Sequence, residues 1–229
     1  MRYRPRCSSE SGNIFIYILG AIFLMGLLII VVRGSDPSGS NIDGERMMIL
    51  TSDVQQYGSE LEQAITAIIR QGHSEGGIRF ALPGTTGPDS IEDQPDRQVF
   101  ARNGGAAAVR KPPPAVTPSG AQWIFSSDLI VGGVGTTCAA PSSACADLAA
   151  LLRVNRAFCR QLNISAGVTN PADEPPVAST TFTTVTDFDG SYTGTIELTD
   201  AGSHLRGHRE GCVQADDGVY FYYRVLLSR

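Results

Sequence analysis

The sequence predicts an α+β protein with an N-terminal transmembrane helix, an amphipathic helix packed on a C-terminal antiparallel β-sheet, and disulfides that staple the folded domain. Three observations lead to this fold class. An uncharged apolar run fills 14–32, apolar residues follow at helical spacing over 47–71, and turn-rich sequence with four cysteines lies beyond them. With 18% charged residues and a net charge of −5, the chain lacks the basic character of a nucleic-acid-binding protein.

The apolar run predicts a membrane span over 13–33. The residues from Ile14 to Val32 carry no charge, and at ~1.5 Å per residue they reach roughly 28 Å, close to the thickness of a hydrocarbon core. A secretory signal would have a shorter apolar core and a small-residue cleavage site, so we expect the segment to be retained. Three arginines precede the run and only Arg33 follows closely, which predicts a cytoplasmic N-terminus and an exported domain.

The five cysteines divide around the apolar run. Cys7 precedes it, whereas Cys138, Cys145, Cys159 and Cys212 follow it, where the predicted topology gives an oxidising compartment. Four cysteines allow three connectivities, and the short loop between Cys138 and Cys145 favours a bridge there, which leaves Cys159 to pair with Cys212. A zinc site is the alternative, but structural zinc ligands usually lie closer together in sequence.

A second helix is expected at 47–71, after a linker at 34–46 that is rich in glycine and serine. Its apolar residues recur every three or four positions, which is typical of an amphipathic helix. A coiled coil and packing on a sheet of the same chain both fit this pattern, and the small residues Gly58 and Ala64 favour the sheet. The remainder, 72–229, is predicted as the exported domain, with a helix at 144–162 and strands at 78–81, 98–101, 123–125, 129–131, 180–186, 192–198 and 219–227.

Motifs for catalysis are weak, and we expect a protein that is not an enzyme and has no cofactor. His204 and His208 have the spacing of a helical metal pair, but neighbouring glycines favour a loop. Asp187 and Asp189 are a weak calcium candidate because alternating carboxylates can converge on a hard cation. A hairpin turn is the alternative for this pair. Asn163 opens a formal glycosylation sequon.

The order of these parts resembles that of a type IV pilin or pseudopilin, most of all the minor pilin-like proteins of bacterial pilus and type II secretion machines. The resemblance covers the architecture of the whole chain, but its specific motif is confined to residues 1–32. It implies a basic cytoplasmic leader at 1–12 that a leader peptidase removes between Gly12 and Asn13. Family members carry a glutamate that sets filament register where this chain has Tyr17, and some subunits at filament tips lack that glutamate.

The resemblance implies a minor pilin-like or pseudopilin-like subunit, a structural protein that acts in assembly or contact of an envelope filament or secretion machine. We expect it in the bacterial inner membrane as a single-pass protein, with its C-terminal domain in the periplasm or in an extracellular filament. The expected partners are other pilin-like subunits, the membrane and the leader peptidase, with no nucleic acid. The alternative is a permanently anchored periplasmic binding or scaffold domain that keeps residues 1–12.

Overall fold

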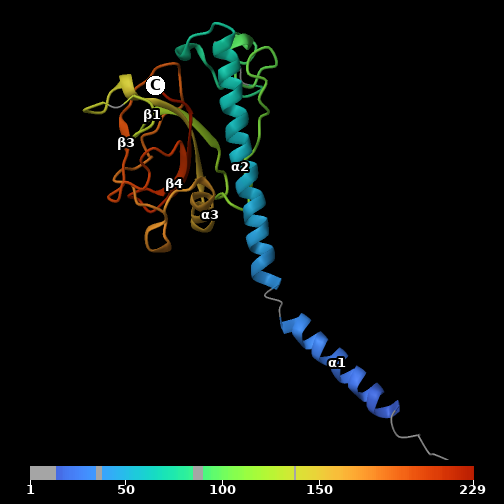
Figure 1. Cartoon of the computed structure of the whole chain (residues 1–229). Coiled ribbons are helices and arrows are strands. Elements are labelled where there is room, and N and C mark those ends of the chain that lie inside the picture. The colour runs from blue at the N-terminus through green and yellow to red at the C-terminus, as the bar shows by residue number, and fades with distance from the viewer. Residues whose placement is uncertain (1–13, 35–37, 85–89, 137) are drawn as a thin grey trace, which may run out of the picture. The chain divides into compact units, whose positions relative to one another are not determined.

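The computed structural model of the chain describes residues 14–34, 38–84, 90–136 and 138–229, with side chains in the first range from 16 to 27 and in the second from 43 onward (Figure 1). The chain forms two compact units, Met1–Arg46 and Met47–Arg229. The predicted leader positions Gly12 and Asn13 lie outside the described residues.

The first unit contains helix α1 (Ile14–Gly34) and the start of helix α2 (Ser38–Arg70). Among the described residues, no helix is both long enough and apolar enough to cross a membrane, which contradicts the transmembrane helix predicted at 13–33. The side chains described in α1 run from Ile16 to Leu27.

Helix α2 begins earlier than the sequence predicts. The expected linker at 34–46 is helical from Ser38 onward. Pro37 is the last residue of this stretch that excludes a helix interior, whereas a glycine such as Gly39 or Gly44 costs only about 1 kcal/mol relative to alanine. The amphipathic segment predicted from residue 47 is therefore the second part of a longer helix.

The second unit is built on one five-stranded sheet with the strand order β3-β1-β2-β5-β4. All neighbours are antiparallel except β1 and β3, which are parallel, so the predicted purely antiparallel sheet is wrong. The two strands expected at 123–125 and 129–131 are one strand with an irregularity in register between Ser126 and Leu129. The strands are β1 (Trp123–Val131), β2 (Asp147–Val154), β3 (Ile196–Leu198), β4 (Glu210–Gln214) and β5 (Tyr220–Leu227).

The helix predicted at 144–162 forms only over its last part, from Arg156 onward. A 3₁₀ turn (Ser143–Cys145) leads into strand β2, and helix α3 (Arg156–Ala166) starts only after Asn155 caps it by accepting a hydrogen bond from the Phe158 N–H. Strand β2 is a central strand and is buried on both faces, so its apolar residues form an unbroken run. Such a run has no period-two alternation, and its pattern cannot be distinguished from that of a buried helix.

Several predicted strands are irregular segments instead. The expected strand at 180–186 does not form, and only 196–198 of the one expected at 192–198 joins the sheet. The segments 78–81 and 98–101 meet through one isolated bridge between Arg79 and Gln98. Side-chain hydrogen bonds hold the segment before β3 without a ladder, as described below. Further 3₁₀ turns lie at Glu75–Gly77, Pro95–Arg97 and Pro171–Asp173.

Three layers make up the second unit, with the sheet in the middle (Figure 1). Even-numbered residues of β2 and β5, such as Ala150 and Tyr222, pack against helices α2 and α3. Odd-numbered residues, such as Leu151 and Tyr223, pack against irregular chain between residues 168 and 205. Because both sheet faces are covered, the loops of this domain are part of its core.

Candidate functional site

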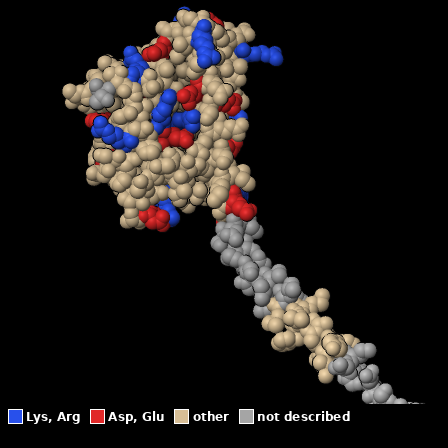
Figure 2. Space-filling model, in the orientation of Figure 1, with Lys and Arg blue, Asp and Glu red and all other residues tan. Residues whose placement is uncertain are grey.

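The described part of α1 is apolar around its whole circumference. Its nine large apolar side chains between Ile16 and Leu27 are each 43–71% exposed. Neither a basic nor an acidic residue interrupts this stretch, which is uniformly tan in Figure 2, whereas basic and acidic residues are mixed over the second unit. A helix that is hydrophobic all round is normally buried, so this surface is a candidate assembly site. Tyr17, the predicted register position, belongs to it and is 71% exposed.

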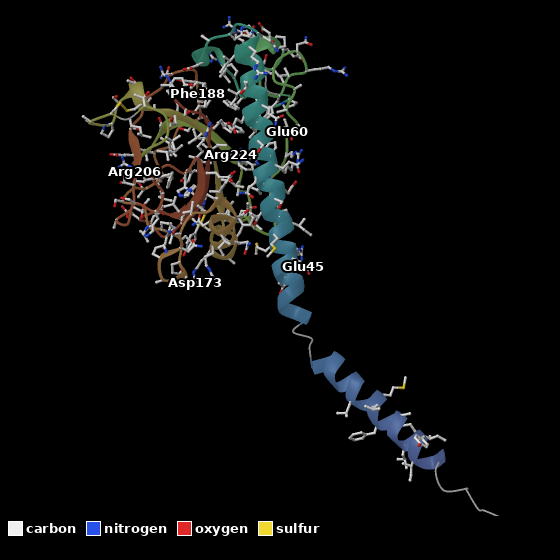
Figure 3. The ribbon with its side chains drawn as sticks, viewed as in Figure 1. Glu45, Glu60, Asp173, Phe188, Arg206 and Arg224 are labelled. Atoms are coloured by element: carbon white, nitrogen blue, oxygen red, sulfur yellow. A yellow bond between two sulfur atoms is a disulfide. The ribbon has the colours of Figure 1, made fainter. Side chains whose placement is uncertain are left out.

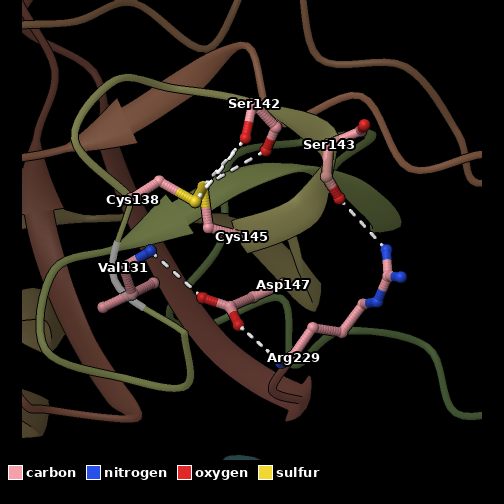
Figure 4. The surroundings of a disulfide bond; sticks show 7 residues. All are labelled: Val131, Cys138, Ser142, Ser143, Cys145, Asp147 and Arg229. Carbon is pink, nitrogen blue, oxygen red and sulfur yellow. Dashed lines mark hydrogen bonds between the residues drawn. A yellow bond between two sulfur atoms is a disulfide. The ribbon is translucent and has the colours of Figure 1, made fainter.

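Two disulfides tie the second unit together, in the pairing that the sequence favours. Cys159 of α3 is bonded to Cys212 of β4, with Cα atoms 5.2 Å apart, and both residues are fully buried. Cys138 is bonded to Cys145 in a surface loop, where the Ser142 hydroxyl lies 3.4 Å from the Cys145 sulfur (Figure 4). Beside this loop, buried Asp147 accepts hydrogen bonds from the backbone N–H groups of Val131 and Arg229.

Asn163 is a structural residue and not an exposed sequon. Its side chain is fully buried, its Oδ1 accepts from the Cys212 N–H at 2.7 Å, and its Nδ2 donates to the Cys212 carbonyl at 2.9 Å. One side chain thus satisfies both outward-facing backbone groups of a residue in edge strand β4. An amide held in this way cannot be reached for glycosylation without unfolding of α3.

A cluster of charged groups joins α2 to the sheet. Arg224 of β5 lies under α2 (Figure 3) and donates to Glu210 at 2.6 Å and to Glu62 at 3.1 Å. Gly58 leaves room for this side chain, because a Cβ at that position would lie 2.3 Å from Cδ of Arg224. The cluster therefore fixes the position of α2 on the sheet.

Asp128 organises the irregular segment before β3. This buried carboxylate accepts from the backbone N–H of Thr186 at 2.8 Å, from the Thr186 hydroxyl at 3.0 Å and from the Thr193 hydroxyl. Burial by itself would raise the pKa of Asp128, but these hydrogen bonds outweigh it and lower the pKa below its usual value. The carboxylate thus holds both ends of the segment 186–193.

We predict that Asp128→Asn reduces the free energy of unfolding by about 2 kcal/mol at neutral pH, since hydrogen bonds to a charged group are lost. Because the folded pKa of Asp128 is depressed, its stabilisation is complete above the unfolded pKa of about 3.9 and is lost as the pH falls through the folded value. Urea unfolding of both proteins between about pH 7 and about pH 2.5 measures this. A difference that stays constant over that range would contradict the prediction.

The weak metal candidates are not brought together into a site. Asp189 Oδ1 closes a turn by accepting from the Ser191 N–H at 2.8 Å, and His204 Nδ1 lies 2.6 Å from Asp200, which also accepts from the backbone of Leu205. Within the described ranges, no group of three or more histidine, cysteine, aspartate or glutamate side chains could hold a metal ion. The contact between Asp200 and His204 is part of a turn.

An aromatic pocket of about 970 Å³ lies between α2, β1 and the loops around them. Its walls include Tyr57, Phe80, Trp123, Phe125 and Phe188, which come from four separate parts of the sequence. Prolines of the segment 112–118 line it as well. The hydrogen bonds of Asp128 help to place Phe188 here, and the Phe188 N–H donates to the Phe125 carbonyl at 2.7 Å. No sequence pattern predicts this pocket.

Comparison with known protein families, with curated proteins and with solved structures finds no match to the chain.

Proposed function

We propose that this chain is a minor pilin-like subunit that acts in assembly or contact of an envelope filament or secretion machine. The observation that carries the proposal is the uncovered apolar surface of α1. In this arrangement the α1 side chains are buried against the apolar helices of other subunits. The disulfide-stapled second unit then provides the part of the subunit that makes specific contacts.

The size of the α1 surface supports assembly as its role. Fully burying one large apolar side chain contributes about 1.5–3 kcal/mol, and nine such side chains are exposed between Ile16 and Leu27. Association must offset lost rotational and translational freedom of about 4–15 kcal/mol. Burial of only part of α1 in a helical bundle is therefore sufficient to drive association.

The second unit supports a location outside the reducing cytoplasm. Two disulfides persist in an oxidising compartment such as the periplasm or the cell surface. Tyr17 cannot provide the negative charge that the family's register glutamate offers to a neighbouring subunit. We therefore place this subunit at a filament tip or at another site that needs no such charge.

Removal of the leader tests the proposal. Intact mass measurement of the protein isolated from its native cells should find a mature chain that begins at Asn13. If residues 1–12 remain attached to a functional protein, the pilin-like proposal is wrong and the permanently anchored scaffold domain replaces it. A Gly12→Leu variant should keep the leader and lose function, because a leucine side chain blocks close approach of a peptidase to the backbone.

The α1 surface is tested separately with Leu24→Glu. We expect at least tenfold less of this variant in the assembled, sedimenting fraction, since burying an unpaired carboxylate costs several kcal/mol. The thermal midpoint of the second unit should not change, because α1 belongs to the other compact unit. Glu197→Gln, a charge change at an exposed site of β3, is the matched control. Normal assembly of Leu24→Glu would contradict a buried role for α1.

A further inference from the structure

The aromatic pocket has two halves that differ in charge. In the first half, Tyr57 packs on Trp123 with ring centroids 5.2 Å apart, and the guanidinium of Arg110 lies 5.4 Å from the centre of the Tyr57 ring. In the second half, Phe80 stacks on Phe125 at 4.2 Å, and Phe188 meets the edge of Phe80 at 6.2 Å. All of these rings line the pocket.

Charges at the first half cancel, although Lys111 has no ion-pair partner among the described residues. Arg110 is neutralised by Glu60 at 2.6 Å and by Asp53 at 3.4 Å. Lys111, the next residue and the only lysine of the chain, is exposed and forms no ion pair with the residues that the structure describes. With two cations and two carboxylates, this end of the pocket has no net charge.

Charges at the second half do not cancel. Asp187 and Asp189 stand beside Phe188, and both are exposed. Arg79 is the cation at this end, and its guanidinium donates to the carbonyls of Gly76 and Ile78 at 2.8 Å each. Two carboxylates against one guanidinium leave a net negative charge, so this end attracts a cationic group.

We propose that the aromatic pocket binds an extended, proline-rich peptide segment of a partner protein, with a basic side chain of that peptide on Asp187 and Asp189. Lys111 at the other end then sets the direction in which the peptide lies. This inference is independent of the proposed function, since it concerns only the second unit and would hold for a scaffold domain as well.

Proline-rich peptides match the pocket in shape and in apolar character. A polyproline II segment is preformed, so it loses little conformational entropy on binding, and its rings pack on aromatic grooves. All its backbone carbonyls are free to accept hydrogen bonds. The volume, about 970 Å³, lies near the upper end of the range for ligand sites.

Trp123 is the only tryptophan of the chain, so its fluorescence reports peptide binding in this test. The probe is a blocked pentapeptide of one arginine followed by four prolines, about 16 Å long as a polyproline II helix. It is titrated into the full-length protein, kept in a mild non-ionic detergent at constant concentration, while tryptophan emission is followed. We expect a saturable change with a Kd between about 10 μM and 1 mM, which is typical of a short, weakly held segment.

Two control peptides separate the charge and the backbone contributions. A peptide with glutamate in place of arginine should bind at least tenfold more weakly, since like charges then face each other at Asp187 and Asp189. A peptide with arginine followed by alternating glycine and serine should give no saturable change, since it has neither proline rings nor a preformed backbone. Equal binding of the arginine and glutamate peptides would overturn the proposal, as would the absence of a saturable change with the arginine peptide.

Three variants locate the binding on the protein. Asp187→Asn should weaken the arginine peptide about fivefold, and Lys111→Glu should strengthen it. Both residues are exposed, so we expect no change in the thermal midpoint. Glu197→Gln removes the same charge from an exposed site on β3, outside the pocket, and should bind as the unaltered protein does. If Asp187→Asn and Glu197→Gln behave alike, the acidic end of the pocket does not bind the basic residue.

Discussion

Replacing Cys159 and Cys212 together with alanine is expected to destabilise the second unit by about 4 kcal/mol, the largest effect that we predict. The bridge closes a loop with a sequence separation of 53 residues, and in the chain-entropy model a loop of this size removes about that much free energy from the unfolded state. Because marginal domains have about 5–15 kcal/mol in total, the variant should be partly unfolded at physiological temperature.

The second disulfide is the matched control for this prediction. Cys138 and Cys145 are separated by only 7 residues, so their joint replacement with alanine should cost about 2 kcal/mol in the same model. Urea unfolding under non-reducing conditions measures both variants. Equal losses would show that loop entropy does not account for the Cys159–Cys212 bridge. A smaller loss from replacing Cys159 and Cys212 would contradict the loop-entropy explanation even more strongly.

Arg224→Met is expected to cost about 3 kcal/mol of unfolding free energy. The methionine fills much of the same space, but it leaves Glu62 and Glu210 facing each other without their common cation. Breaking a buried ion pair by removing one partner typically costs about 3–5 kcal/mol, and the partial exposure of the two glutamates places this case at the lower end. Chemical denaturation at neutral pH measures the loss.

A rescue experiment shows whether charge is the cause. Adding Glu62→Gln and Glu210→Gln to Arg224→Met removes the uncompensated carboxylates, and it should recover at least half of the lost stability. Arg206→Met is the control, since Arg206 is exposed and forms no ion pair with the described residues, and it should change stability by less than about 0.5 kcal/mol. A triple variant no more stable than Arg224→Met would indicate a packing defect instead.

Sequence patterns predict the parts of this fold in which apolar residues recur at a regular spacing. They fail where contacts with distant residues determine whether a segment is a helix, a strand or irregular chain. Apolar spacing over 47–71 corresponds to the part of α2 whose residues Tyr57, Leu61 and Ile65 pack into the core, and a run of aromatic and branched residues near the C-terminus marks β5. Strand β2 is mistaken for a helix because both of its faces are buried. The strands predicted at 180–186 and 192–198 are mostly irregular, and the stretch from Thr186 to Thr193 is held by Asp128, a distant side chain that no local pattern identifies.

Candidate sites likewise differ in whether local sequence is enough to predict them. The predicted bridges follow from loop length, since Cys138 and Cys145 are close in sequence. The transmembrane prediction at 13–33 rested on apolar length alone, and the structure contradicts it. The aromatic pocket could not be predicted, since Tyr57, Phe80, Trp123 and Phe188 are separated by long stretches of sequence and share no spacing.

Asn163 has a consequence for how copies of this domain can meet. An edge strand with open backbone groups can recruit a strand from another chain and extend the sheet across molecules. On β4, the amide of Asn163 occupies the N–H and carbonyl of Cys212, and Pro176 and Ala178 occupy those of Gln214. Strand addition at this edge is therefore blocked, so a neighbouring molecule that contacts it must be recognised through side chains. Contacts of that kind depend on the identity of the partner, which suits an assembly of fixed order better than indefinite sheet growth.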